Sequence, residues 1–323
     1  MSSATTLSPS LSRRRSRLLL TVAGAVGVAA AAVVGWFLRD PEPIFAARRG
    51  ALVAVDSASP IADGDVQETR YRLTGSSGLV FELALREPHP AAARPTVRRT
   101  LFLILGGHQR GAAAGALLGD TRGALIASIA YPFTGNADAK GLALLGEVPA
   151  IRRALYDTPP AVSLALDHLL ARPDVDPNRV ELVGASFGAP FATIAAARDL
   201  RVSRLWLAHG GGRPLLVIER GLEREIGAAV LRWPVAVLAD LLASGPRFAP
   251  ERWIGRVAPR PVVMLNALED ERVPRASVDA LWAAAREPRE MVWLPGQHMM
   301  GSRPEVLRAL VDSVMVRAAR SPR

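Results

Sequence analysis

The feature that most constrains the fold of this chain is an alternation, after residue 98, of short apolar runs with segments of helical length. The runs expected to be strands are residues 100–105, 124–130, 179–183, 204–207, 261–265 and 291–294. The segments expected to be helices are residues 160–170, 187–197, 277–286 and 303–317. A hairpin of residues 66–73 and 79–86, joined by a Gly-containing turn, is expected before them. This order predicts an α/β fold with a mostly parallel central sheet and helices on both faces.

The alternation stops between residues 210 and 257. Residues 215–226 and 228–242 have helical length, and Pro234 and Gly245-Pro246 interrupt the apolar pattern. We expect a helical lid insertion at about residues 213–256, above the carboxyl ends of the strands, where such sheets bind ligands. The alternative is an ordinary covering layer of the sheet.

The amino-terminal region carries the pattern of a membrane signal anchor. Four arginines within residues 13–17 precede residues 18–38, which contain no charge. As a helix these 21 residues would span about 31 Å, the thickness of a hydrocarbon core. We expect residues 1–17 to form a cytoplasmic basic tail and residues 18–38 to form a single-pass transmembrane helix, because basic residues stay on the cytoplasmic side. The rest of the chain would then lie in the periplasm or outside the cell. A cleaved export signal and a buried helix are the alternatives.

Residues 39–65 have prolines at positions 41, 43 and 60 and no sustained period. This composition predicts a linker between the membrane and the folded domain. The α/β domain would therefore comprise residues 66–323.

Charge and composition exclude several classes of function. Residues 1–50 supply half of the net charge of +10, and the remainder shows no basic stripe interleaved with aromatic residues, so we expect no nucleic-acid partner. The chain has no cysteine, which excludes disulfides and a thiolate nucleophile. The five histidines are scattered without an H-E-x-x-H motif, and no G-x-G-x-x-G follows a strand. We therefore expect no metal and no cofactor.

The strongest local motif is Gly184-Ala185-Ser186-Phe187-Gly188, which fits the pattern G-x-S-x-G. A predicted strand ends directly before it and a predicted helix begins directly after it. Such a turn projects a serine on strained backbone, and glycines flank it because side chains there would collide with neighbouring elements. Ser186 is therefore the candidate nucleophile.

A serine nucleophile needs a general base, and the order of residues narrows the choice. In enzymes that carry the nucleophile on such a turn, the acid and then the histidine follow it along the chain. Only His209 and His298 follow Ser186. His298 lies in a loop directly after the last predicted strand and is the candidate base. His209 lies in a Gly-rich turn and is expected to have a pocket or structural role.

The candidate acid is Asp270, which lies five residues beyond the strand predicted at residues 261–265. A carboxylate there would fix the tautomer of the histidine and stabilise the imidazolium. Glu269 and Glu271 flank it and remain alternatives.

Two backbone N–H groups are expected to form an oxyanion hole. One belongs to Phe187, the residue after the nucleophile. The other is expected from Gly107 or His108, in the glycine-containing loop after the strand predicted at residues 100–105.

Together, residues 184–188, the late Asp270 and the terminal His298 resemble the α/β-hydrolase superfamily. The segments Arg172-Pro-Asp-Val-Asp-Pro-Asn-Arg179 and Ala258-Pro-Arg-Pro-Val262 are similar to the branch of dienelactone hydrolases, acetyl esterases and prolyl oligopeptidases. The resemblance covers roughly residues 66–320, but the His-Gly usual at the oxyanion loop is Leu105-Gly106 or Gly106-Gly107 here.

The resemblance and the motifs predict a serine hydrolase that cleaves a small-molecule acyl ester through an acyl-enzyme. A peptidase or an acyl transferase could use the same three residues. A catalytically silent binding or scaffold protein at the membrane is the alternative from another class.

Overall fold

The structure is a computed structural model of the chain, and it describes residues 31–89, 98–107 and 111–320 together with residues 21, 24, 25, 27 and 28. The chain divides into two compact units, Met1–Pro41 and Glu42–Arg323.

In the first unit, residues 31–38 are helical. The predicted basic tail at residues 1–17 lies outside the described residues, as do residues 18–20, 22, 23, 26, 29 and 30 of the predicted signal anchor at residues 18–38. No helix among the described residues combines the length and the apolar character needed to cross a bilayer. The signal anchor therefore stays a prediction.

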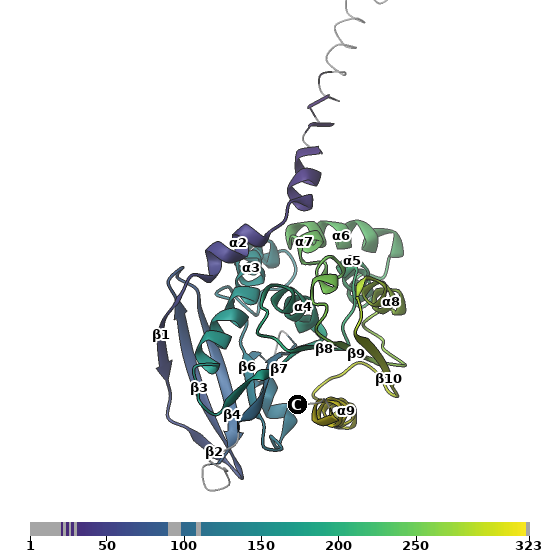
Figure 1. The fold of residues 1–323 in the computed structure, drawn as a ribbon. Helices are drawn as coiled ribbons and strands as arrows, with labels where there is room; N and C mark the ends of the chain where they lie inside the picture. Colours follow the sequence, from purple (N-terminus) through teal and green to yellow (C-terminus); the bar gives the residue numbers. More distant parts are fainter. Residues whose placement is uncertain are drawn as a thin grey trace, which may run out of the picture. The chain divides into compact units, whose positions relative to one another are not determined.

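The second unit is built on one sheet, to which the described residues contribute ten strands (Figure 1). The strands are β1 (Leu52–Ser57), β2 (Ile61–Asp63), β3 (Val66–Gly75), β4 (Val80–Pro88), β5 (Arg99–Leu105), β6 (Leu125–Ile129), β7 (Val175–Ala185), β8 (Arg204–Ala208), β9 (Val262–Ala267) and β10 (Arg289–Leu294). Their order is β1-β3-β4-β6-β5-β7-β8-β9-β10, with β2 paired to β3. Pairing is antiparallel from β1 through β4 to β6 and parallel from β6 to β10, so the prediction of a mostly parallel sheet is confirmed.

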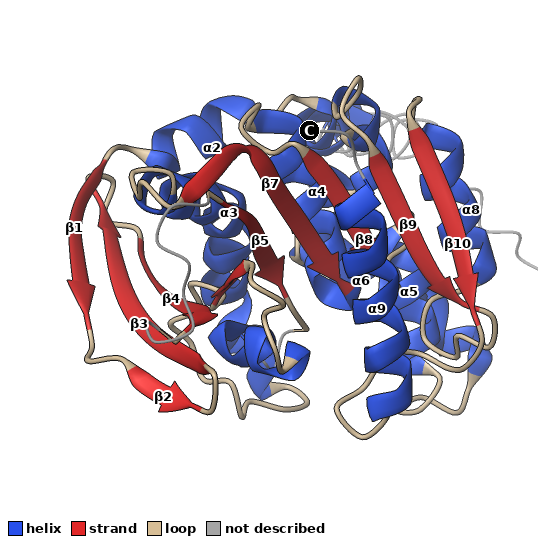
Figure 2. Cartoon of the chain, turned by 60° about the horizontal axis from the view of Figure 1, so that its bottom comes forward, coloured by secondary structure: helices blue, strands red, loops and turns tan. Residues whose placement is uncertain are grey.

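Helices cover both faces of this sheet, also as predicted. Figure 2 shows α9 (Pro304–Arg320) crossing one face, with α3 (Ala143–Leu169), α4 (Ala189–Arg198) and α8 (Arg275–Ala284) behind the strands. Successive residues of β8 and β9 pack into different cores. Leu205, Leu207 and Met264 join the larger core on the α3 and α4 face. Trp206 and Leu265 join a smaller core with α9. Strands buried on both faces read as continuous apolar runs, which explains why they were recognisable in the sequence.

Helix α3 begins 17 residues before the segment predicted for it and includes Pro149, Pro159 and Pro160. A proline inside a helix removes one backbone hydrogen bond and usually ends or kinks the helix. Here every residue from Tyr156 to Leu166 is buried, so packing on all sides of the helix outweighs that cost.

The prediction of a linker at residues 39–65 is wrong from Glu42 onward. Residues 42–65 form α2 (Glu42–Arg49), β1 and β2 of the second unit. Phe45 is fully buried, and its ring lies 5.8 Å from Tyr156, 6.0 Å from Phe248 and 5.8 Å from Trp253. Two of the three prolines that suggested a linker, Pro41 and Pro43, stand just before and inside the first turn of α2, where proline is well tolerated.

Salt bridges reinforce this attachment. Glu42 accepts hydrogen bonds of 2.6 and 2.8 Å from Arg198 on α4. Arg48 donates to Asp157 on α3 over 2.6 Å. The folded domain therefore begins near Glu42 rather than at residue 66.

This boundary leads to a test of stability. Phe45→Ala should lower the free energy of unfolding by about 3–5 kcal/mol, because it leaves a cavity among three aromatic rings. Leu200→Ala, at a position that is 82% exposed, is the matched control and should change it by less than about 0.5 kcal/mol. Urea unfolding followed by circular dichroism measures both, and equal effects would contradict the new boundary.

Candidate active site

The candidate nucleophile lies on a tight turn between β7 and α4. Ser186 has a φ of 52°, a left-handed conformation that is strained for a non-glycine residue. A Cβ at Gly188 would lie 2.0 Å from the carbonyl oxygen of Leu105 on β5. A Cβ at Gly184 would lie 2.6 Å from the Cβ of Ala192 on α4. Both glycines are therefore needed for the turn to pack against the central strand and the helix.

The structure brings Ser186 and His298 together although 112 residues separate them. The Ser186 hydroxyl lies 2.8 Å from Nε2 of His298, which is in the loop after β10. The other ring nitrogen, Nδ1, lies 2.8 and 3.0 Å from the two carboxylate oxygens of Asp270. Because an ionised carboxylate only accepts, Nδ1 carries the proton and Nε2 accepts from the serine.

Asp270 follows β9 in a loop that holds its carboxylate firmly. The backbone N–H groups of Arg272 and Val273 each donate to Oδ1 over 2.8 Å. Burial alone would raise the pKa of Asp270. The hydrogen bond and charge of His298 and the two backbone donors outweigh it, so that the pKa is lowered below its usual value. The carboxylate is therefore ionised and oriented at neutral pH.

The structure distinguishes Asp270 from its neighbours Glu269 and Glu271 by the groups that each carboxylate contacts. Glu269 accepts from the backbone N–H of Gly296 over 2.5 Å. Glu271 accepts from the backbone N–H of His298 over 2.9 Å and from Arg303 over 2.8 Å. Those donors lower the pKa of Glu271 to about 2, although its desolvation acts in the opposite direction. Of the three described carboxylates, Asp270 is the one that contacts the imidazole ring, and the two glutamates fix the backbone of the loop that carries it.

His209 lies beside this chain of hydrogen bonds, at the end of β8. It is buried, its φ is 50°, and its Nδ1 accepts from the backbone N–H of Met299 over 2.9 Å. The ring centroids of His209 and His298 are 5.3 Å apart. Burial, and then the charge of His298, lowers the pKa of His209 to about 4, against the opposing effect of Asp270 and Glu271. His209 is therefore neutral and acts as a support for the His298 loop.

The oxyanion loop is described in part. Gly107 lies after β5 with open space on the side where a Cβ would project, whereas His108 lies outside the described residues. The hydroxyl of Tyr131 donates to the carbonyl of Gly106 over 2.5 Å, and burial raises the pKa of that hydroxyl. Tyr131 thus anchors the loop beside Gly107. No sequence motif singles out Tyr131, and its position two residues after the apolar strand β6 was the available signal.

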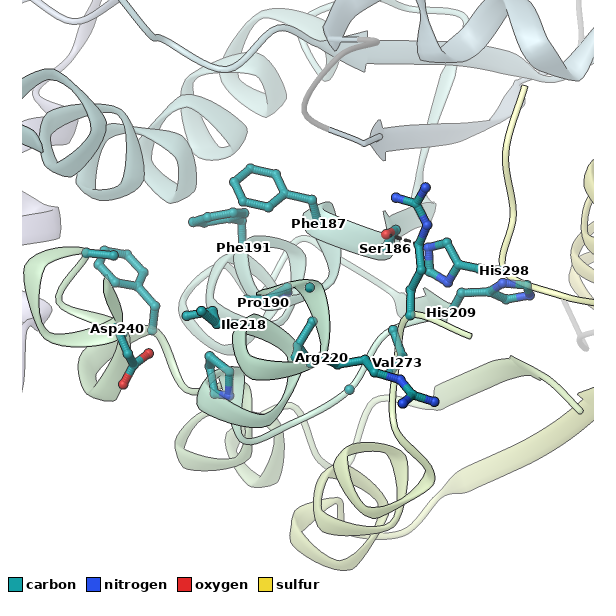
Figure 3. Close-up of a pocket in the computed structure, with 18 of the residues that line it drawn as sticks. Ser186, Phe187, Pro190, Phe191, His209, Ile218, Arg220, Asp240, Val273 and His298 are labelled. Carbon is teal, nitrogen blue, oxygen red and sulfur yellow. Dashed lines mark hydrogen bonds between the residues drawn. The ribbon is translucent and has the colours of Figure 1, made fainter. Parts of the chain in front are cut away.

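A mostly apolar pocket of about 350 Å³ opens beside Ser186 and His298 (Figure 3). Its walls come from α4, from the loops after β8 and β9, and from the region where a lid was predicted. That region folds into α5 (Pro214–Leu222), α6 (Ala229–Leu242) and α7 (Gly245–Phe248). The apolar lining includes Phe187, Pro190, Phe191, Val217, Ile218, Phe248 and Val273. The site therefore combines a hydroxyl–imidazole–carboxylate chain with space for an apolar group.

One group of three possible metal ligands exists among the described residues: His209, Asp270 and His298, whose donor atoms lie within 4.8 Å of one another. Both ring nitrogens of His298 and Nδ1 of His209 already take part in the hydrogen bonds given above. Since these hydrogen bonds already use the donor atoms, we assign no metal to the group.

Comparisons with curated proteins find distant relatives. No family model matches the chain. It is 27% identical over 165 residues to the uncharacterized protein YfhR of Salmonella typhi, a match covering 50% of this chain and 53% of that protein. It is also 27% identical over 138 residues to the protein of the same name in Salmonella typhimurium, a match covering 42% of this chain and 45% of that protein. The chain thus spans about half the length of the curated relatives that it matches.

Solved structures match over most of the second unit. An acetyl xylan esterase from Paenibacillus sp. R4 has a TM-score of 0.59 at 15% identity, covering 84% of this chain and 92% of that one. A cold-adapted esterase from an Arctic intertidal metagenomic library has a TM-score of 0.55 at 17% identity, covering 82% and 100%. The alpha/beta hydrolase GrgF from Penicillium sp. sh18 has a TM-score of 0.52 at 15% identity, covering 78% and 99%. At these identities the likeness shows a shared fold.

The buried, neutral His209 predicts a pH-dependent stability. The folded state holds its pKa near 4, whereas histidine in an unfolded chain titrates near 6.5, so the unfolded state binds the proton first as the pH falls. The contribution of neutral His209 is complete above about pH 6.5 and is lost as the pH falls towards 4. Wild type should lose about 2 kcal/mol more unfolding free energy between pH 7 and pH 5 than His209→Asn, whose amide oxygen can still accept from Met299 and whose backbone tolerates positive φ. Urea titrations at both pH values measure the difference, and parallel losses in the two proteins would contradict it.

Proposed function

We propose that this chain, whose predicted α/β-hydrolase fold is confirmed, is a serine hydrolase that cleaves an ester-type bond through an acyl-enzyme. The observation that carries the proposal is the unbroken chain of hydrogen bonds from Ser186 through His298 to Asp270 at the edge of an apolar pocket. Three structural neighbours bear the names of esterases or hydrolases, which supports ester cleavage as the reaction.

In the proposed reaction the oxygen of Ser186 attacks the ester carbonyl carbon while its proton passes to Nε2 of His298. The carbonyl oxygen becomes negative, and the backbone N–H of Phe187 and that of Gly107 or His108 would stabilise it. The imidazolium then gives its proton to the leaving alcohol as the ester C–O bond breaks, which leaves the acyl group on Ser186. A water molecule, deprotonated by the same ring, releases the acid and restores the serine.

Asp270 and the residues around it orient the imidazole ring of His298 for both halves of the reaction. The carboxylate holds the tautomer in which Nε2 is free to accept, and it stabilises the positive ring that forms in each half of the reaction. Glu271 and Arg303 hold the main chain of His298 from both sides, since Arg303 also donates to the carbonyl of His298 over 2.7 Å. The imidazole therefore needs little reorganisation when the proton moves.

The first test removes the nucleophile and the base. Ser186→Ala and His298→Ala should each lower kcat for a p-nitrophenyl ester by at least about 10³-fold, and the double variant should be little worse because the residues act as a unit. A fluorophosphonate probe should label the wild type and fail to label Ser186→Ala. Ser57→Ala, on β1, is the matched control and should keep full activity.

Outcomes of this test also separate the alternatives. Full activity in Ser186→Ala would refute the assignment. Absence of labelling and of turnover in the folded wild type would favour a silent binding protein. Cleavage of peptide amides at rates comparable to esters would favour a peptidase, and transfer of the acyl group to an added alcohol in preference to water would favour an acyl transferase.

The second test concerns the three acidic residues. Asp270→Asn removes the anion and favours the wrong tautomer of His298. The same change costs about 10⁴-fold in kcat in a serine protease with this kind of triad, so we expect kcat to fall by several orders of magnitude. Glu269→Gln and Glu271→Gln should cost much less, because an amide oxygen can still accept from the backbone N–H of Gly296 or His298. Steady-state kinetics measure kcat for the three variants and so test which carboxylate acts on His298. A mild Asp270→Asn beside a severe glutamate variant would reassign the acid.

A further inference from the structure

A second buried carboxylate borders the same pocket at its other end. Asp240 lies near the carboxyl end of α6, is 8% exposed and lines the pocket that also contains Ser186 and His298. Figure 3 shows it across the pocket from those two residues, with Ile218 and Phe191 between them. The proposed reaction does not use this group.

Asp240 lacks the partners that a buried carboxylate normally has. Its Oδ1 atom is buried and makes no hydrogen bond within the described part of the chain. Burial, and then the charge of Glu251, raises its pKa to about 6. Buried polar groups are nearly always hydrogen-bonded, and an unsatisfied one costs folding free energy. The position is therefore one where a ligand would supply the missing partner.

The local backbone makes room for this carboxylate. A Cβ at Gly245 would lie 1.7 Å from Oδ1 of Asp240, so only a glycine allows the carboxylate to lie against α7. Gly245 and Phe248 of α7 also line the pocket. The acid is thus seated by a specific backbone position within an otherwise apolar wall.

We propose that the pocket binds an aliphatic chain that ends in a hydroxyl group, with the hydroxyl on Asp240 and the ester at Ser186. This inference rests on the proposed function and names its class of substrate. A hydroxyl both donates and accepts, so it pairs with Asp240 whether the carboxyl is ionised or protonated. An ammonium group fits less well, because Arg220 and Arg224 line the same pocket and their positive charges would repel it.

The experiment compares matched esters. For each of several chain lengths, kcat/KM is measured for the p-nitrophenyl ester of an ω-hydroxy acid and of the unsubstituted acid with the same number of carbons. The selectivity is the ratio of the two kcat/KM values. An effect of a substitution on the chemical step changes both values equally and therefore cancels in this ratio. Acetate esters of diols and of the matching alkanols form a second series, which tells whether the acyl or the alcohol side occupies the pocket.

Asp240→Leu should lower the selectivity for the hydroxylated ester about tenfold or more at the best chain length, since one well-placed hydrogen bond to a charged group is lost. Asp240→Asn fits against Gly245 and keeps an acceptor oxygen, so it should lower the selectivity by a smaller factor. Asp279→Leu, at an exposed carboxylate on α8, is the matched control and should leave it unchanged.

Two results would overturn the inference. Equal selectivity in wild type and both Asp240 variants would mean that Asp240 serves only the second cavity that it borders, beside Trp233 and Glu251. A preference for an ω-ammonium chain over the hydroxyl chain would replace the proposed ligand class.

A binding measurement keeps this inference separate from the proposed function. In Ser186→Ala, calorimetry should show tighter binding of the ω-hydroxy acid than of the plain acid, and Asp240→Leu in the same background should abolish the difference. Absence of that difference counts against the hydroxyl site even where Ser186-dependent hydrolysis is intact. Its presence supports the site even where turnover fails.

Discussion

The close contact between the turn after β7 and the central strand β5 is the constraint on which the site depends. Gly188 touches the carbonyl of Leu105 at a distance that no side chain would permit. This contact fixes the start of α4 and holds Ser186 in its left-handed conformation at the carboxyl end of the sheet. Because parallel strands end at the same edge, the loops after β8, β9 and β10 reach the serine from neighbouring positions. The order of the strands in the sheet therefore brings the residues of the site together.

The loops after β9 and β10 are joined by hydrogen bonds to three consecutive carboxylates. Glu269 holds Gly296, Asp270 holds the ring of His298, and Glu271 holds its main chain. Three negative charges in a row would repel one another, but each lies against different donors. Preorganisation of this kind favours proton transfer, since the groups that receive charge are already in place. The buried and neutral His209 adds a support without adding charge.

The sequence allowed the fold to be predicted, and it pointed to a candidate nucleophile and a candidate base that the structure brings together, because their signals are local or depend only on order along the chain. Buried parallel strands are continuous apolar runs, and a serine between strand and helix is a short motif. Other features depend on contacts between distant positions. Phe45 is recognisable as core only beside Tyr156, Phe248 and Trp253, which lie more than 100 residues away. The choice among Glu269, Asp270 and Glu271 likewise required the positions of their donors, which adjacency in sequence does not reveal.

The two ends of the pocket share an energetic property. At one end Ser186 has strained backbone, and at the other the buried Oδ1 atom of Asp240 makes no hydrogen bond to the described residues. Each costs folding free energy, and neither improves the packing of the core. Such costs persist where the surrounding structure imposes them, and they concentrate at functional sites. The apolar residues between them, among them Phe191 and Ile218, have no polar atom with which to orient a ligand. In the proposed binding mode the ligand is therefore held at both ends of the pocket, by the reacting bond at Ser186 and a polar group at Asp240, while Arg220 and Arg224, which also line it, disfavour a cation.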